Sequence, residues 1–393
     1  MVLRDSSPLR IAFGNLCTKS WIAGCHYLKN LFIALKTQPN APELILYGRS
    51  ADGTDAMLAE YLSETLDPPV ARFRGRQLIG RLERRFGVPL GAGRDHAALL
   101  RDQGIDAIFA GDLLGSAFDL PHVAWLPDFQ HVHLPHMFSQ QEREGRDRIY
   151  RRTVRWSNRI ILSSHSALED LEKFAPEDAP TGRVVNFTAQ VSPTLYDHDP
   201  AWVRELHHLP DRFFYLPNQF WKHKNHETVV EALGLLKAKG TPVTVVCSGN
   251  TNDSRNPDYF SALKSRIQSL GIEDQFIILG MIPHDHIFPL IRQSLAVLQP
   301  SLFEAWSTSV EETKSIGKHI IVSDLPVHRE QNPPQARYFV PRDPQALADA
   351  LIEVDAKVHP GPDLELEQSA REDLPRRTSA FGEAFMRVIA EIL

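Results

Sequence analysis

The stretch that decides the fold is Pro300–Ser323, which reads PSLFEAWSTSVEETKSIGKHIIVS. One apolar run, residues 295–299, leads into it, and a second, residues 318–323, ends it. Between these runs Ser309–Ile316 has the spacing of a helix, and Gly317 is placed to end that helix. The stretch therefore predicts a strand, a loop, a helix and a further strand, which is the repeating unit of a parallel α/β sheet.

The loop and helix of this stretch carry residues that suit an anion site. Ser307, Thr308 and Ser309 favour a helix start, where unpaired N–H groups and the positive end of the helix dipole attract a phosphate. Glu304 and Glu312 flank this turn, a little over two helical turns apart, so both carboxylates can face one pocket. Carboxylates accept hydrogen bonds from hydroxyls, so the pattern predicts a sugar-nucleotide site. The alternative is a pair of solvated helix-face charges.

Two successive halves of the chain repeat the same alternation of apolar runs and amphipathic stretches. The expected strands are 10–14, 44–47, 106–110, 122–126 and 159–163 in the first half, then 213–216, 243–248, 276–280, 295–299 and 318–323 in the second. Their hydrophobicity is continuous, which indicates parallel sheets covered on both faces. We therefore expect an α/β protein of two doubly wound Rossmann-like domains that face each other across a cleft.

Two polar segments mark the expected domain boundaries. Asp197–Asp199 precedes Pro200 and reads as a linker, and its DHD triplet reads as turn chemistry rather than a metal site. His359–Leu374, rich in proline and acidic residues, reads as a second linker before the amphipathic segment Thr378–Leu393. The expected parts are a first domain of residues 1–196, a second of residues 201–375, and a C-terminal helix, 376–393, that packs back on the first.

Composition excludes several classes of protein. The chain has 393 residues, 42% of them hydrophobic and 23% charged, which is ordinary for a globular protein of two domains. Its net charge of −6 argues against a general nucleic-acid binder. Cys17, Cys25 and Cys247 form no CxxC pair and predict reduced thiols. We expect a cytoplasmic protein, because the chain shows neither a signal peptide nor an apolar run of about 20 residues.

On these residues the decisive stretch resembles the donor-site signature of retaining GT-B-fold glycosyltransferases, those of the large sucrose-synthase-like family (glycosyltransferase family 4, group 1). That signature usually reads PSxxEGFGxxxxEA and is followed by GKPVIxSD. The resemblance implies that Glu304 contacts hydroxyls of the donor sugar and that Glu312 holds the ribose. Ala305 and Ser307 stand where the family usually has glycines. Their backbone N–H groups remain available to a phosphate.

A second match lies at residues 215–226, which resemble the turn that opens the family's second domain. In the family an arginine and a lysine of this turn hold the diphosphate. Lys224 occupies the lysine position, Gln219 stands at the arginine position, and Lys222 is the candidate for the missing charge. A fixed cation stabilises the charge that develops on a leaving diphosphate. A solvated basic turn is the alternative.

The first half supplies two further matches. Gly24 lies in a turn, residues 21–27, that resembles the family's glycine-containing approach to the donor phosphates. Residues 125–136 resemble a cleft-facing loop, which implies that His131 contacts the transferred sugar, with Asp128 as a second candidate. The three histidines of this loop lack a cysteine or a suitably spaced acid, so no metal site is predicted.

The resemblance implies a glycosyltransferase that retains anomeric configuration and needs neither a cofactor nor a metal. The first domain then lies on the acceptor side, and the second holds the nucleotide sugar. The diphosphate lies on Lys224 and the Ser307–Ser309 amides, and the base lies near Met281 and Ile282. The acceptor is a glycan or a lipid-linked saccharide of polysaccharide biosynthesis, at the inner face of the membrane.

Two alternatives share the architecture. One is a nucleotide-sugar epimerase, and the other is a non-catalytic sugar-nucleotide-binding subunit, which the departures at Ala23, Gln219 and Ala305 leave open. A glycogen-type phosphorylase does not fit, because it requires a pyridoxal-phosphate lysine and a much longer chain.

Two arginine-rich stretches remain, Arg72–Arg85 and Arg143–Arg159. The first interleaves arginines with leucine, isoleucine and phenylalanine, a basic amphipathic pattern that suits peripheral contact with an anionic membrane. The alternative for both stretches is a solvated face whose arginines pair with nearby carboxylates.

Overall fold

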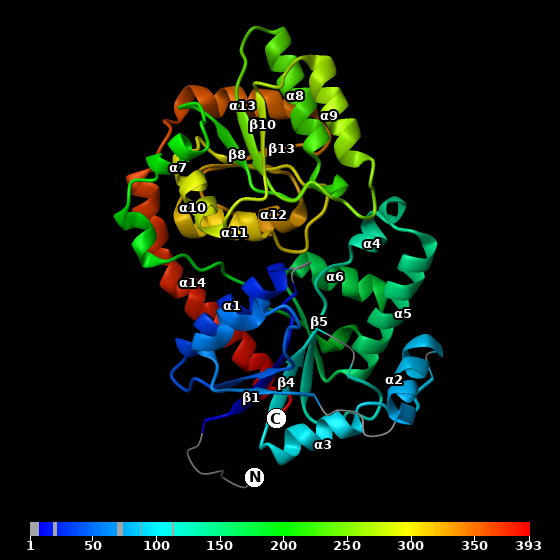
Figure 1. Cartoon of the computed structure of the whole chain (residues 1–393). Coiled ribbons are helices and arrows are strands. Elements are labelled where there is room, and N and C mark those ends of the chain that lie inside the picture. Colours follow the sequence, from blue (N-terminus) through cyan, green and yellow to red (C-terminus); the bar gives the residue numbers. More distant parts are fainter. Residues whose placement is uncertain (1–7, 19–21, 69–73, 87, 112–113) are drawn as a thin grey trace. The chain divides into compact units, whose positions relative to one another are not determined.

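The computed structural model describes residues 8–18, 22–68, 74–86, 88–111 and 114–393, which form two compact units (Figure 1). The first unit contains the described residues up to Phe129, then Ser139–Thr188 and Arg376–Leu393. The second unit contains Gln130–Phe138 and Ala189–Pro375.

The first unit is built on a seven-stranded sheet in the order β3-β2-β1-β4-β5-β6-β7, in which all neighbouring strands are parallel. Its strands are β1 (Arg10–Gly14), β2 (Glu43–Tyr47), β3 (Glu64–Leu66), β4 (Ala107–Ala110), β5 (His122–Trp125), β6 (Arg159–Leu162) and β7 (Gly182–Val184). Its helices are α1 (Ile22–Lys36), η1 (Thr54–Tyr61), α2 (Arg74–Phe86), α3 (Arg94–Asp102), α5 (Gln140–Trp156), α6 (His165–Phe174) and η3 (Ala179–Thr181).

The second unit is built on a six-stranded parallel sheet in the order β10-β9-β8-β11-β12-β13. Its strands are β8 (Phe214–Leu216), β9 (Val245–Ser248), β10 (Phe276–Gly280), β11 (Val297–Gln299), β12 (Ile320–Ser323) and β13 (Ala336–Phe339). Its helices are α4 (Gln130–His133), η2 (Pro135–Met137), η4 (Pro193–Asp197), α7 (Ala201–Leu206), η5 (Lys222–Lys224), α8 (His226–Ala238), α9 (Tyr259–Leu270), α10 (His284–Gln293), α11 (Thr308–Ile316), α12 (Pro326–Gln331) and α13 (Pro344–Lys357).

Both sheets are doubly wound, as the sequence predicts. In each, the chain order runs outward on both sides of one central pair, which is β1 and β4 in the first unit and β8 and β11 in the second. This pair is the topological switch point, and parallel α/β sheets bind ligands at the carboxyl ends of the strands there.

The central strands of the second unit show why their hydrophobicity is continuous. Phe214 and Leu216 pack into one core, among residues of α8, α9 and α13. Phe213 and Tyr215 point to the other face and pack with residues of α7, α10 and α11. Every residue of β8 is fully buried. Helices therefore cover both faces, and no position on the strand is left for a solvated side chain.

One further helix, α14 (Leu364–Ala390), belongs to both units. The linker predicted at residues 359–374 is wrong, because α14 begins inside it and continues through Pro375. Asp363 Oδ1 accepts a hydrogen bond from Leu366 N at 3.0 Å and so stabilises the start of the helix. The acidic and proline-rich composition that suggested a linker is carried by a helix.

The last part of α14 packs on the first unit, which confirms the expected C-terminal helix. The Phe385 ring stacks on Phe13 of β1 with 5.8 Å between ring centroids. A Cβ at Gly382 would lie 2.4 Å from the Ala34 carbonyl oxygen of α1, so only glycine permits this approach.

The prediction of reduced thiols is wrong for two of the three cysteines. Cys17 and Cys25 form a disulfide, whose Cα atoms lie 4.5 Å apart between the end of β1 and the first turns of α1. That separation is within the range a disulfide spans, and sequence spacing alone does not reveal it. Cys247 is free and buried in β9. None of the described helices is long and apolar enough to cross a membrane.

Candidate active site

The candidate site lies at the switch point of the second unit, where β8 and β11 end. Asn218 follows β8, and its Nδ2 donates a hydrogen bond to Gln299 Oε1 at 2.5 Å. Gln299 ends β11, and its Nε2 donates to Glu304 Oε1 at 2.9 Å and to Ser307 Oγ at 2.7 Å. Asn218 and Gln299 are buried. These amides join the two strand ends and fix both the Glu304 carboxylate and the start of the next helix.

Lys224 and Glu304 form an ion pair in this site. Lys224 Nζ lies 2.6 Å from Glu304 Oε1, and the two side chains are only 15% and 12% exposed. Asn225 holds the loops together, because its Nδ2 donates to the Pro300 carbonyl oxygen at 2.9 Å. Its left-handed backbone, with φ 60°, suits an asparagine. The ammonium keeps N–H groups beyond the one on Glu304, which an anionic ligand can use.

The start of α11 is held open beside this pair. Ser307 occupies the N-cap position, but no side chain caps the helix, because the Ser307 hydroxyl accepts its bond from Gln299. Gln331 of α12 clamps the Ser307 backbone, accepting from its N–H at 3.1 Å and donating to its carbonyl oxygen at 3.0 Å. The helix begins at Thr308, one residue before the predicted start. Its first-turn N–H groups therefore face the loop without a side-chain acceptor.

Ser307 stands where the resembling family usually has glycine, and the backbone explains why serine fits. Its φ is −82° with ψ 117°, which is ordinary extended backbone that any residue adopts. The substitution therefore costs no strain at this position.

Two adjacent glutamates of α11 differ in their surroundings. Glu311 is buried, and its carboxylate accepts hydrogen bonds from Lys314 Nζ at 3.1 Å and Gln331 Nε2 at 3.2 Å. Glu312 is half-buried, and no described residue donates a hydrogen bond to it. Loss of hydration raises the pKa of Glu312 to about 8. Glu311 is thus part of the scaffold, and Glu312 is left for a ligand.

The raised pKa of Glu312 predicts that Glu312→Gln stabilises the fold relative to the wild type, and that this stabilisation grows with pH. The folded wild type holds a proton on Glu312 that the unfolded chain releases above pH 4.5, so the contribution of Glu312 to wild-type stability falls as the pH rises from 4.5 toward about 8. We expect the free energy of unfolding of Glu312→Gln, relative to the wild type, to rise by up to about 4 kcal/mol between pH 5 and pH 8.5 in urea titrations, and by less to the extent that solvent reaches the half-buried carboxylate. The exposed Glu273→Gln is the control and should show no such rise. A Glu312→Gln curve parallel to the wild type would contradict the assignment.

Other predicted donor-site residues also lie in the second unit. The backbone N–H of Lys222 donates to Asp253 at 3.0 Å, and its side chain is half-buried. Gln219 Oε1 accepts from Asn250 N at 2.7 Å and so holds the loop after β9. The side chain of Met281 is 69% exposed, whereas Ile282 packs against the core of the sheet.

The predicted residues from the earlier part of the chain divide between the units. His131, on α4, is buried and belongs to the second unit. Gly24 lies buried in the first turn of α1, in the first unit. Asp128 also belongs to the first unit, where Arg146 Nη1 lies 3.2 Å from its carboxylate. Their roles toward a donor stay predictions.

Sequence reasoning missed residues that hold the site in place but are not part of the family motif. Besides Asn218, Gln299 and Gln331, Gly249 after β9 has φ 148°, and a Cβ there would lie 2.4 Å from the Asn218 carbonyl oxygen. The tripeptide Ser248-Gly249-Asn250 after an apolar run was the available signal for this close approach. The three amide side chains had none, because each bonds to at least one residue 24 or more positions away in the sequence.

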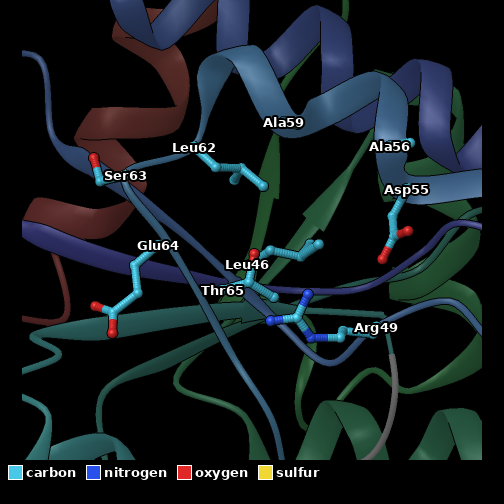
Figure 2. A pocket seen from close by; sticks show the side chains of 9 residues that line it. All are labelled: Leu46, Arg49, Asp55, Ala56, Ala59, Leu62, Ser63, Glu64 and Thr65. Carbon is cyan, nitrogen blue, oxygen red and sulfur yellow. The ribbon is translucent and has the colours of Figure 1, made fainter. Parts of the chain in front are cut away.

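A hollow of about 310 Å³ lies in the first unit, between β2, β3 and η1 (Figure 2). Figure 2 shows Arg49 and Asp55 on its wall. Arg49 already pairs with Asp67 at 3.1 Å, and Asp55 accepts hydrogen bonds from Asn15 and Ser50. These charges serve the fold, so the switch point of the second unit remains the candidate site. Across the described residues, no group of three His, Cys, Asp or Glu side chains is placed to hold a metal ion.

The second unit thus carries a cation, two carboxylates and an open helix start at the switch point of a doubly wound sheet, and the two parallel α/β sheets of the chain give a GT-B-like fold. Residues 203–357 match the family model described as Glycosyl transferases group 1, a range that includes Lys224, Glu304 and Glu312. This part of the chain is therefore similar to the family that the sequence resemblance predicted.

Solved structures share the fold over nearly the whole chain. A glycosyltransferase from Rickettsia africae matches with a TM-score of 0.67 at 14% identity, covering 98% of this chain and 99% of that one. HepE from Anabaena, in complex with UDP and glucose, matches with a TM-score of 0.68 at 17% identity, covering 97% and 99%. Sucrose-phosphate synthase from Thermosynechococcus elongatus matches with a TM-score of 0.63 at 16% identity, covering 98% and 94%. A search of curated proteins found no significant sequence match.

Proposed function

We propose that this protein transfers a sugar from a nucleoside-diphosphate donor to a glycan or lipid-linked saccharide, with retention of configuration and without a metal. The observation that carries the proposal is the ion pair of Lys224 and Glu304, fixed at the switch point beside the uncapped start of α11. Glu312 lies on the same helix, and no described residue donates a hydrogen bond to its carboxylate. It therefore adds a second acceptor for hydroxyl groups.

The site residues have distinct roles in this proposal. Lys224 and the first-turn N–H groups of α11 bind the diphosphate, and they stabilise the negative charge that develops as it leaves. Glu304 accepts hydrogen bonds from the sugar hydroxyls, and Glu312 accepts them from the ribose. Met281 and Ile282 border the base.

The chemical step needs no protein nucleophile. The bond between the anomeric carbon and the diphosphate oxygen breaks, and the acceptor oxygen attacks the same face of the sugar. The acceptor proton passes to the departing phosphate, so charge and atoms balance. The contribution of the protein is to hold the leaving group and to exclude water.

The donor nucleotide is tested by thermal stabilisation. Structures of Anabaena HepE were solved with UDP and with UDP-glucose, so UDP is the first candidate here. A ligand at about a hundred times its dissociation constant adds about 2.7 kcal/mol of stability. We expect one of UDP, GDP, ADP and TDP to raise the melting temperature by several degrees, about 5 °C, and Glu312→Ala to abolish that shift. No shift with any of the four would contradict a nucleotide site.

Two assays separate the alternatives. A transferase releases free nucleoside diphosphate only when an acceptor is present. An epimerase changes the sugar of the donor without releasing the nucleotide. A sugar-nucleotide-binding subunit shows the thermal shift but no turnover over a broad acceptor panel.

A further inference from the structure

Exposed apolar side chains gather at α2 and the segment after it. Of the fourteen large apolar side chains that are exposed among the described residues, four lie between positions 78 and 90. They are Leu78 at 55%, Phe86 at 65%, Val88 at 52% and Leu90 at 45% exposure. Isolated exposed apolar residues are ordinary, but a cluster within one short segment marks a surface that another molecule covers.

Cations flank this apolar cluster. Arg81 and Arg85 are exposed, and with Leu78 they follow the spacing i, i+3, i+7, which places the three on one face of α2. Neither arginine forms an ion pair with a carboxylate among the described residues. The guanidinium of Arg85 instead lies 5.7 Å from the centroid of the Phe86 ring. The sequence left open that these arginines form ion pairs with nearby carboxylates on a solvated face. Within the described part of the chain, Arg81 and Arg85 do not form such pairs.

The one acidic residue of α2 is turned away from this face. Glu83 is only 2% exposed, and its carboxylate accepts hydrogen bonds from Ala92 N at 2.9 Å and Ser116 Oγ at 2.7 Å. These hydrogen bonds help to hold the pKa of Glu83 below its usual value. The carboxylate thus anchors the helix to the unit and contributes no negative charge to its exposed side.

The cationic surface continues onto α5, which lies next to α2 (Figure 1). Arg152 of α5 is buried, and its Nη1 donates to the Glu83 carbonyl oxygen at 2.6 Å. Arg148 and Arg155 stand four positions before and three after Arg152, so they share its side of the helix. Both are exposed and pair with no described carboxylate, and Ile149 beside them is 44% exposed. Arg72 and Phe73 of the predicted patch lie outside the described residues.

We propose that this α2–α5 surface, made of Leu78, Arg81, Arg85 and Phe86 with Arg148 and Arg155, docks on the anionic face of a phospholipid bilayer. Apolar side chains enter the headgroup region while flanking arginines bind lipid phosphates. A soluble polyanion suits the arginines but leaves the exposed phenylalanine, valine and leucines uncovered. The surface is separate from the donor site, so the inference does not rest on the proposed function.

Vesicle sedimentation tests the proposal. We expect the full chain to bind vesicles of phosphatidylcholine mixed with phosphatidylglycerol, and to bind phosphatidylcholine alone much more weakly. Binding should fall as salt rises. Each arginine near an anionic bilayer changes the partition coefficient about fivefold, so Arg81→Gln with Arg85→Gln should lower it about 25-fold. Leu78→Ser with Phe86→Ser should lower it at least about tenfold.

Matched controls separate this surface from general charge and apolarity. Lys36→Gln with Lys264→Gln removes two exposed cations elsewhere, and Trp202→Ser with Leu206→Ser removes two exposed apolar side chains from the second unit. Both double variants should bind vesicles as the wild type does. All variants should keep the nucleotide-induced thermal shift, which shows that the fold and donor site are intact.

Three outcomes would overturn the proposal. The first is equal binding to neutral and anionic vesicles, and the second is vesicle binding that the α2 variants leave unchanged. The third is binding to duplex DNA or RNA, lost in the arginine variant, with no binding to vesicles. A missing nucleotide shift in the wild type would count against the proposed function but not against the docking surface.

Discussion

Lys224→Met is expected to lower kcat of the transfer reaction by about 10²–10³-fold, because in the proposed mechanism it removes the cation that stabilises the departing diphosphate. The change should leave the fold intact, since Glu304 retains its hydrogen bond from Gln299 at 2.9 Å. Glu304→Gln should lower kcat by a comparable factor, because an amide accepts hydrogen bonds from the sugar hydroxyls more weakly than a carboxylate. The measurement is the rate of nucleotide release with acceptor present.

The double variant tests whether the two residues act as one unit. If the ion pair positions both groups, Lys224→Met with Glu304→Gln should lose little more activity than either single change. The exposed Lys264→Met is the matched lysine control and should keep wild-type turnover. Near-normal turnover in both single variants would show that Lys224 and Glu304 do not form the active site.

Arg292→Met has the largest expected effect on stability. Arg292 and Glu367 are 4% and 6% exposed and form two hydrogen bonds, at 2.7 Å and 3.0 Å. The guanidinium also donates to the carbonyl oxygens of Leu195 and His198, in the segment that opens the second unit. Removing it leaves a buried carboxylate and two carbonyls without their donor. We expect the free energy of unfolding of the second unit to fall by about 3–5 kcal/mol, and its melting temperature to fall by about 10 °C.

An exposed pair provides the control for this loss. Arg266 and Glu231 make a similar two-point contact at 2.6 Å and 2.7 Å, but their side chains are 49% and 37% exposed. Arg266→Met should therefore change the free energy of unfolding far less than Arg292→Met does. Arg292→Met combined with Glu367→Leu should recover much of the loss, because no buried charge is left. Equal losses for the exposed and buried pairs would contradict the explanation.

The interior strands were predictable because both faces of each are buried, which leaves a continuous apolar run in the sequence. The strands β3, β7 and β13 were missed because they are short edge strands with partly exposed side chains. Such strands carry a mixed pattern that resembles a loop. The start of α14 was missed because proline and acidic residues usually indicate a loop. Here the acidic residues lie in the first turn of the helix, and Pro375 lies inside it.

The site was predictable only where its residues fall within one local motif. Lys224, Glu304 and Glu312 follow strand ends at family spacing, so the sequence identified them as candidates. The sequence did not distinguish Glu311 from Glu312 by environment, because helix rotation and the reach of Gln331 decide which carboxylate is paired. Asn218 and Gln299 are 81 positions apart in the sequence. They come into hydrogen-bond contact only because β8 and β11 are neighbouring strands in the folded sheet.

The division of α14 between the units has a consequence for how this protein is made. Residues 376–393 leave the ribosome after the whole of 189–375, yet they supply Phe381 and Phe385, both buried in the first unit. At about 5–20 residues per second, the first unit waits for roughly ten seconds or more with part of its core unfilled. During that time Phe13 and Phe109 lack the apolar cover that Phe385 provides. Chaperones that bind exposed aromatic side chains should therefore meet the nascent first unit during synthesis and leave it once the last helix has docked.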